Sequence, residues 1–215
     1  MSEEILSLLT NSLVDGDPDA TIDATQLALR EGMEPMEIIR QGLMPGMDIV
    51  GQKFAEGEYF LPDLIIAAEG MKKAMELLEP ELRLRQQVLE TAGTVVIGTV
   101  KGDIHEIGKS LVATMLSANG FTVHDLGVDV SKDAFLTKVQ ETGANILGMS
   151  ALLTTTMTQQ REVIKALQES GLRERVKVMV GGAPVTKSWA AEIGADGYAE
   201  DAMGAVQLAR SLAAK

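Results

Sequence analysis

One of only two histidines in the chain lies on a glycine-flanked segment, GTVKGDIHEIGKSLV, at residues 98–112. Asp103 precedes His105 by two residues, and Gly102 and Gly108 stand on either side of the pair. A carboxylate at that spacing can hold the Nδ1–H of the imidazole, which leaves the neutral Nε2 free to ligate a metal ion. The glycines let a bulky group approach the backbone. The segment therefore predicts a metal-binding loop with His105 as the ligand.

The absence of cysteine and the presence of only two histidines exclude several kinds of metal site. The chain has no cysteine, which rules out disulfides, thiol nucleophiles and thiolate zinc sites. The second histidine, His124, falls within a strand-like run with no motif around it, and we interpret it as structural. The remaining coordination of a metal at His105 must then come from a cofactor, for which a tetrapyrrole is the obvious candidate. Alone, a histidine beside an aspartate is more typical of a hydrogen-bonded packing residue.

Composition favours a cytoplasmic globular protein. The chain has 215 residues, of which 46% are hydrophobic, enough for one large domain or two small ones. The net charge of −12 disfavours nucleic acid and anionic membranes as partners, since both require basic patches. No apolar run approaches the ~18–20 residues that cross a bilayer. The acidic start MSEEILSLLT also lacks the basic region of a signal peptide, so we expect no membrane partner.

Apolar residues recur at helical spacing in the first part of the chain. Asp17 followed by Pro18 predicts the start of a helix that Gly32 closes, and Glu34-Pro35 predicts the start of the next. Four helices with short connections indicate a small antiparallel bundle. In the last of them, spacing at i, i+3, i+4 and i+7 predicts a buried stripe that consists of Leu61, Leu64, Ile65, Ala68, Met71, Met75 and Leu78.

The third helical segment carries residues that disrupt helices. Gly42 and the pair Pro45-Gly46 fall inside its periodic pattern. An interior proline removes a backbone donor and clashes with the preceding turn. We therefore expect a kink or a break at this point.

A different pattern follows a charged stretch, EPELRLRQQVLETAG, at residues 79–93, which we interpret as a linker. Short apolar runs then alternate with helix-like segments, from TVVIGTV through FTVHDLGV, ANILGMSALL and VKVMVGGAPV to a weak DGYAE. Ser131 and Gly143 mark the ends of one such helix. This alternation predicts a doubly wound, five-stranded parallel sheet with right-handed crossovers. The chain thus divides into a helical domain, residues 1–89, and an α/β domain, residues 90–215.

Three loops at the carboxyl ends of the expected strands meet where doubly wound sheets bind ligands. Gly102–Gly108 follows the first strand, Ser150–Leu152 the third, and Gly181-Gly182 the fourth. In this order they resemble the cobalamin-binding signature D-x-H-x-x-G, then S-x-L, then G-G. The chain thereby resembles the corrinoid proteins of methyltransferase systems. Its first half is similar to the helical cap that precedes the cobalamin-binding domain in cobalamin-dependent methionine synthase.

The resemblance implies a Rossmann-like, flavodoxin-like domain that holds cobalamin in the base-off/His-on form, with its nucleotide tail inserted into the domain. His105 is then the lower axial ligand of cobalt, and Asp103 orients it. The implied cofactor-binding set comprises Gly102, Asp103, His105, Ile107 and Gly108 of the first loop, Ser150, Leu152 and Thr154, which line the tail pocket, and Gly181 and Gly182, which let the tail pass close to the backbone.

The same resemblance implies a methyl carrier. Cob(I)alamin accepts a methyl group from a methylated donor through a substrate-specific methyltransferase. Methylcobalamin passes it to a second methyltransferase, whose acceptor is tetrahydrofolate or a thiol coenzyme. The chain is then a cofactor-carrying subunit and not an enzyme on its own, because it has no zinc thiolates and no room for a substrate barrel. A reductive activase is a further partner that the family admits. Methylamines, methanol, betaines and aryl methyl ethers all stay open as donors.

Two other functions share parts of this pattern. The cobalamin subunit of an adenosylcobalamin-dependent mutase shares D-x-H-x-x-G, but such subunits resemble only the second half of the chain. Cobalamin-based light-sensing regulators resemble both halves but usually carry a DNA-binding segment, and no basic segment is present here.

The methionines of the helical half also have two explanations. The resemblance places Met33–Met47 and Met71–Met75 near the reactive face of the cofactor. As a simpler explanation, methionine fills gaps in the core of an alanine-rich bundle.

Overall fold

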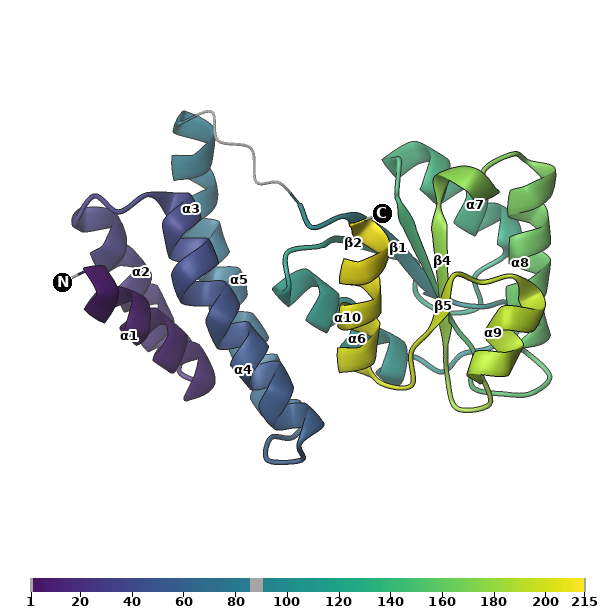
Figure 1. Cartoon of the computed structure of the whole chain (residues 1–215), viewed down its shortest axis with the longest axis horizontal. Helices are drawn as coiled ribbons and strands as arrows, with labels where there is room; N and C mark the ends of the chain where they lie inside the picture. The colour runs from purple at the N-terminus through teal and green to yellow at the C-terminus, as the bar shows by residue number, and fades with distance from the viewer. Residues whose placement is uncertain (1, 86–90, 215) are drawn as a thin grey trace. The chain divides into compact units, whose positions relative to one another are not determined.

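The computed structural model describes residues 2–85 and 91–214, and the chain divides into two compact units, Met1–Glu90 and Thr91–Lys215 (Figure 1). The first unit is helical, and the second contains a five-stranded parallel sheet. The predicted fold class is thereby confirmed. Among the described residues, no helix is both long and apolar enough to traverse a bilayer.

The helical unit is a bundle in which α1 packs against α2, α4 and α5. Its elements are α1 (Ser2–Val14), α2 (Pro18–Arg30), α3 (Pro35–Glu37), the π-helical η1 (Ile38–Leu43), α4 (Met44–Ala55) and α5 (Leu61–Leu84). Asp17 caps α2 as predicted, since its Oδ1 accepts a hydrogen bond of 2.9 Å from the Ala20 N–H. Pro18 occupies the first helical position, where its missing N–H costs nothing.

The predicted break near Pro45 takes the form of a π-helical turn. In η1 the N–H of Met44 donates to the carbonyl of Ile39, five residues back, where an α-helix would use the fourth. Pro45 then falls in the first turn of α4. The regular α-helical hydrogen-bond pattern is interrupted just before this position, and a proline, which has no N–H to donate, is tolerated at such an interruption. The chain thus resumes an α-helix directly after the insertion.

The buried side of α5 differs from the predicted stripe. Leu61 and Ile65, which the stripe assigns to the core, are 37% and 52% exposed. The helix instead turns small residues toward the bundle, and a Cβ added to Gly70 would lie 3.2 Å from side-chain atoms of α1 and α2. Close approach along these small residues rotates the two larger side chains outward. The buried apolar side chains of α5 are Leu64, Ala67, Met71, Ala74, Leu78 and Leu82.

The helix α5 also continues into the stretch that we predicted as a linker. It runs to Leu84 with Pro80 inside it, so the predicted loss of helix from residue 79 is wrong. The turn beyond the proline is held because Leu82 is buried and Arg85 forms an ion pair of 2.7 Å with Glu34. Residues 86–90 of the predicted linker lie outside the described residues.

Three of the methionines of the two rich segments belong to the bundle core, and the other three, Met36, Met44 and Met75, are half-buried. Met33, Met47 and Met71 are buried, at 6%, 1% and 5% exposure. A flexible thioether adapts to irregular gaps between helices. Their burial agrees with the explanation that these three side chains fill the bundle core.

The α/β unit places all five strands parallel in the order β2-β1-β3-β4-β5, which is the flavodoxin-like order. The strands are β1 (Thr94–Thr99), β2 (Thr122–Asp125), β3 (Ile146–Ser150), β4 (Lys177–Gly181) and β5 (Gly197–Tyr198). The helices are α6 (Ile107–Ala118), α7 (Lys132–Thr142), α8 (Thr158–Glu169), the short 3₁₀ turn η2 (Arg173–Arg175), α9 (Lys187–Ile193) and α10 (Ala202–Ala213).

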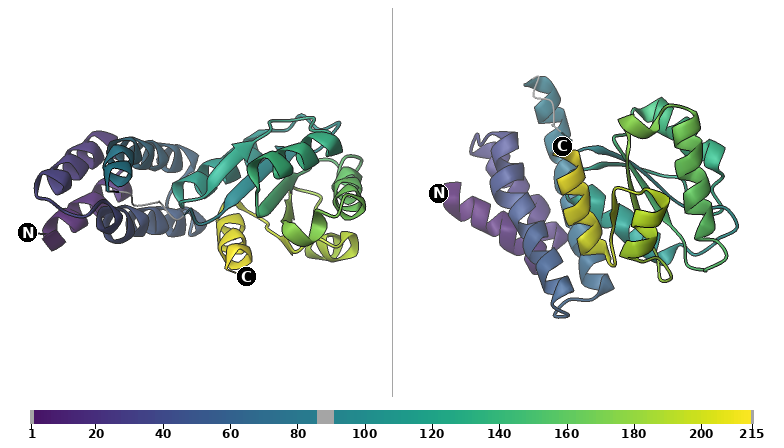
Figure 2. Two further views of the ribbon diagram at one scale, coloured as in Figure 1. Left: turned by 90° about the horizontal axis from the view of Figure 1, so that it is seen from above. Right: turned by 45° about the vertical axis from the view of Figure 1, so that its right-hand side comes forward.

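Helices cover both faces of this sheet (Figures 1 and 2). The helices α6 and α10 pack together on one face, and α7, α8 and α9 form the layer on the other. The core under the second layer joins Val96 and Leu147 of the central strands to Phe135 of α7 and Val163 of α8. These strands are buried on both faces, which explains their continuous apolar sequences.

Helix ends in the α/β unit follow the sequence signals. The Oγ of Ser131 accepts a hydrogen bond of 3.2 Å from the Ala134 N–H and caps α7, as predicted. Gly143 ends the same helix at φ 63°, a left-handed conformation that favours glycine. The predictions for both ends of α7 are confirmed.

Candidate functional site

The register of the sheet brings the three predicted loops to one edge. Thr99 of β1 pairs with Ser150 of β3, which pairs with Gly181 of β4, so the last residues of these strands lie in one row. The chains that follow are joined directly. The Ala151 N–H donates to the Gly181 carbonyl at 3.2 Å. The loop after β1 reaches the loop after β3 through Asp103.

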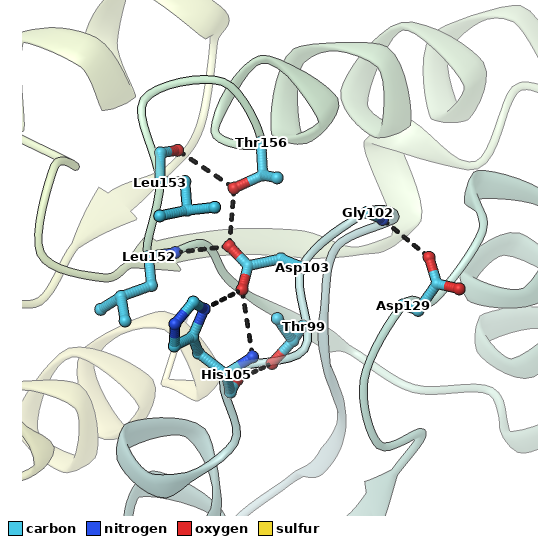
Figure 3. Close-up of polar contacts among 8 residues, drawn as sticks. All are labelled: Thr99, Gly102, Asp103, His105, Asp129, Leu152, Leu153 and Thr156. Atoms are coloured by element: carbon cyan, nitrogen blue, oxygen red, sulfur yellow. Dashed lines mark hydrogen bonds and ion pairs between the residues drawn. The ribbon is translucent and has the colours of Figure 1, made fainter.

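The Asp103 carboxylate is the centre of this site (Figure 3). It is buried, and each of its oxygens accepts two hydrogen bonds. On Oδ1 these come from the Nδ1 of His105 at 2.7 Å and the backbone N–H of His105 at 3.1 Å. On Oδ2 they come from the Leu152 N–H at 2.8 Å and the Thr156 Oγ1 at 2.6 Å. One carboxylate thus ties His105 to the loop after β3.

These hydrogen bonds decide the charge of Asp103. Burial by itself raises the pKa of the carboxyl, because it disfavours the charged form. The hydrogen bonds from Thr156, Leu152 and His105 favour the charged form and outweigh burial, so the pKa of Asp103 lies well below its usual range. The Thr156 hydroxyl, which also lies 3.0 Å from the Leu153 carbonyl, therefore faces a carboxylate as its closest acceptor.

The imidazole of His105 is held on one side and open on the other. Its Nδ1 donates to the Asp103 carboxylate, which fixes the neutral ring in the tautomer with a free lone pair on Nε2. The Thr99 Oγ1 donates to the His105 carbonyl at 2.9 Å and holds the backbone as well. The side chain is 46% exposed. The arrangement can present a single neutral nitrogen ligand at the carboxyl edge of the sheet.

Exposed apolar side chains belong to the same loops. Ile104 and Ile107 are 76% and 79% exposed, and Leu152 and Leu153 are 41% and 44% exposed. The Cα of Gly108 faces open space, since a Cβ there would meet no atom within 4 Å. A large, flat apolar group with a metal at its centre is the kind of ligand that such a surface can accept.

The glycines after β1 and β4 are required by the chain itself. Gly102 has φ +80°, and its N–H donates to the Asp129 Oδ1 at 2.7 Å. Gly182 has φ +118°, and a Cβ there would lie 1.8 Å from the Ala151 carbonyl oxygen. A Cβ at Gly181 would lie 3.1 Å from the Ala199 carbonyl oxygen. The backbone conformation thus favours glycine at position 102, and close backbone packing between strand ends favours it at positions 181 and 182, whatever their contact with a cofactor.

The other predicted residues occupy the same edge with fewer contacts. Ser150 is half-buried at the end of β3, and Thr154 is exposed in the turn before α8. His124 is half-buried on the edge strand β2, where it pairs with Val96, so it lies on a strand and outside the three loops.

Sequence reasoning missed two polar residues that organise the site. Thr156 supplies a hydroxyl to Asp103 from 53 residues away, and its only sequence signal is a run of threonines after β3. Gln160 is fully buried, and its Nε2 donates to the carbonyls of Met149 at 3.1 Å and Gly181 at 3.3 Å. Its Oε1 accepts from the indole of Trp189 at 3.0 Å. Gln160 therefore ties the carboxyl ends of β3 and β4 together.

We expect Asp103 to make the α/β unit sensitive to acid. Its pKa is depressed on folding, so its contribution to stability is complete above the unfolded value of about 4 and is lost as pH falls toward the folded value. Asp103→Asn should lower the free energy of unfolding at pH 7 by about 2–3 kcal/mol and flatten its decline below pH 4. Denaturant unfolding of the cofactor-free chain, followed by the fluorescence of Trp189, measures both.

The matched control is Asp133→Asn, which changes an exposed carboxylate in the first turn of α7. This variant should keep the acid dependence of the wild type. An Asp103→Asn protein with an unchanged slope between pH 5 and pH 2 would refute the assignment of that dependence to Asp103.

The fold and this site define a B12-binding protein. Residues 93–207 match the B12 binding domain family, and residues 5–79 match a second family with the same description. Dimethylamine corrinoid protein 2 of Methanosarcina acetivorans is 49% identical, over 98% of this chain and 96% of that protein. Trimethylamine corrinoid protein 2 of Methanosarcina mazei is 46% identical, over 95% and 94%. The chain therefore belongs to the corrinoid proteins, and its cofactor is cobalamin.

A solved structure agrees with this assignment. The methanol:cobalamin methyltransferase complex MtaBC from Methanosarcina barkeri contains a chain with 32% identity and a TM-score of 0.87, where the match covers 98% of this chain and 80% of that one. The residues found here also fit a corrinoid. The lone pair on the Nε2 of His105 is available to cobalt, and the exposed apolar side chains of the same loops suit a large macrocycle.

Proposed function

We propose that this corrinoid protein carries methyl groups between two partner methyltransferases. One observation carries the proposal. The exposed imidazole of His105 is hydrogen-bonded through Nδ1 to the buried, ionised carboxylate of Asp103 at the carboxyl edge of the sheet. When bound, cobalamin supplies the cobalt that takes up and releases the methyl group. The α/β domain, residues 90–215, holds this cofactor, and the helical domain, residues 1–89, is the module that resembles the family's cap.

The residues have separate tasks. The Nε2 of His105 would hold the cobalt, and Asp103 keeps the proton of the neutral ring on Nδ1, so that Nε2 carries the free lone pair. Thr156 and the backbone of Leu152 hold Asp103 in place. Around the rest of the cofactor, Gly102, Ile107, Gly108, Ser150, Leu152, Thr154, Gly181 and Gly182 form the binding set that the signature implies.

A methylated amine is the donor that we infer. Two relatives that match nearly the whole chain at 49% and 46% identity are corrinoid proteins named for dimethylamine and trimethylamine, whereas the chain of the methanol complex is 32% identical. The amine-specific methyltransferase is then the first partner. A second methyltransferase takes the methyl group to tetrahydrofolate or a thiol coenzyme, and a reductive activase restores the reduced cofactor.

Charge is distributed unevenly between the two halves and suits docking on a basic partner. Residues 1–90 contain seven lysines and arginines against eighteen aspartates and glutamates, whereas residues 91–215 contain twelve against thirteen. Nearly all of the net charge of −12 therefore belongs to the helical half. Such a field accelerates encounter with a positively charged surface and is screened by salt.

The carrier proposal predicts that transfer from an amine requires a partner. Reduced holo protein should be methylated directly by methyl iodide. With dimethylamine or trimethylamine, its absorption spectrum should stay unchanged until the cognate methyltransferase is added. The transfer rate should then fall several-fold as ionic strength rises from 0.05 to about 0.3 M, because the Debye length shortens. Corrin spectroscopy follows each step.

Two controls complete this test. The methanol-specific methyltransferase with methanol should produce no comparable methylation if an amine is the donor. Multiple turnovers of an amine and an acceptor by this chain alone would contradict the carrier role.

A further inference from the structure

Asp129 has a backbone conformation that few side chains adopt. It is the one non-glycine residue with positive φ in the described parts of the chain, at 54°. It lies in the segment Gly127–Val130, between β2 and α7. A non-glycine residue in this region is strained and persists where surrounding contacts hold it.

The contacts that hold Asp129 come from the loop that carries the ligand. Its Oδ1 accepts the N–H of Gly102 at 2.7 Å, and its own N–H donates to the Asp103 carbonyl at 2.9 Å. Figure 3 shows the carboxylate of Asp129 opposite the Gly102 N–H, on the far side of the loop from His105. Side chain and backbone of one residue thus bracket the Gly102–Asp103 peptide.

The rest of the segment is fastened beside the end of β1. The Thr99 N–H donates to the Gly127 carbonyl at 2.9 Å, and the Val130 N–H donates to the Thr99 carbonyl at 3.0 Å. Val100 and Val130 form a parallel β-bridge. The backbone on both sides of Asp129 is therefore held against the end of β1. The hydrogen bond from Gly102 to Asp129 in turn fixes the position of the loop after β1.

We propose that Asp129 is a positioning residue for the axial ligand. Asp129 holds the Gly102–Asp103 peptide in place and so positions the Asp103 side chain. Asp103 in turn orients the ring of His105 through the 2.7 Å hydrogen bond to Nδ1. The inference rests on the proposed role of His105 as the cobalt ligand. It adds to the site a residue from the β2–α7 connection, a segment that contains none of the signature residues.

Three substitutions distinguish the effect of the hydrogen-bond acceptor of Asp129 from the effect of its left-handed backbone conformation. Asp129→Asn keeps an oxygen acceptor and tolerates the left-handed region. Asp129→Gly keeps the conformation and removes the acceptor. Asp129→Ala removes both. Thermal unfolding followed by Trp189 fluorescence establishes that each variant is folded. If Asp129→Ala does not fold, Asp129→Gly is used for the test.

The measurements are the dissociation constant of cobalamin and the nitrogen coupling of cobalt in the Co(II) form by EPR. Asp129→Gly and Asp129→Ala should raise the dissociation constant about three- to tenfold, which is less than the ten- to a hundredfold for groups that contact a metal ligand, because Asp129 acts through Asp103. They should also reduce the nitrogen-coupled fraction. Asp129→Asn should stay within about twofold of the wild type.

A double-mutant cycle with His105→Ala decides whether Asp129 acts through the ligand. In that background, Asp129→Ala should leave the dissociation constant unchanged. A shift of the same size with and without His105 would overturn the positioning role. Unchanged binding and coupling in both Asp129→Gly and Asp129→Ala would overturn it as well. Absence of nitrogen coupling in the wild type would instead remove the axial ligand itself, and with it this inference.

Discussion

Holo protein with His105→Ala is expected to lose all nitrogen coupling from the EPR spectrum of its Co(II) form. The imidazole is exposed and its Nε2 carries the free lone pair, which is why we propose this side chain as the ligand to cobalt. Affinity for cobalamin should fall by at least about tenfold, as removal of groups that merely support a ligand already costs ten- to a hundredfold.

The second histidine provides the control for this experiment. His124→Ala changes a half-buried side chain on the edge strand β2, away from the three loops. It should retain the coupling and the affinity of the wild type. Persistence of the coupling in His105→Ala, or its loss in His124→Ala, would remove His105 as the axial ligand.

Gly182→Ala should destabilise the α/β unit more than any other glycine substitution at the site. The added Cβ would lie 1.8 Å from the Ala151 carbonyl oxygen, and φ +118° is strained for any side chain. Backbone on both sides leaves little freedom to relax, because the Ala151 N–H is bonded to the Gly181 carbonyl. We expect the free energy of unfolding to fall by more than about 4 kcal/mol, in the range reserved for severe backbone conflicts.

The matched control for Gly182 separates clash from conformation. Gly194 also has positive φ, at 78°, but a Cβ there would meet no atom within 4 Å. Gly194→Ala should therefore cost only about 1 kcal/mol, the penalty of the left-handed backbone. Denaturant titrations monitored at Trp189 compare the two variants. Equal losses would show that the contact with Ala151 is not what requires glycine at position 182.

The fold was predictable because its signals are local. Runs of apolar residues marked the first four strands, a weaker pattern marked β5, and Ser131 and Gly143 marked the ends of α7. Where the prediction was wrong, tertiary packing overrode a local rule. The helix α5 runs beyond residue 79, where we expected a linker, because Leu82 is buried, and Ile65 is exposed although it belongs to the expected stripe.

The site was predictable only in part, for a different reason. Asp103 and His105 are two residues apart, so their contact can be inferred from spacing alone. Thr156 and the Leu152 N–H reach Asp103 across about fifty residues of sequence, and backbone groups leave no signal in residue type. Asp129 escaped notice because its role depends on a backbone angle, which a single sequence does not display.

Saturation of the Asp103 carboxylate has a consequence for loading of the cofactor. All four of its hydrogen bonds come from the chain itself, so the orientation of the His105 ring does not depend on a bound corrinoid. Immobilising a side chain during association costs about 0.5–1.5 kcal/mol, and for this ligand that entropy is already lost when the domain folds. A cofactor-free chain thus already holds the proposed metal ligand in place, and we expect cobalamin to load without a rearrangement of His105.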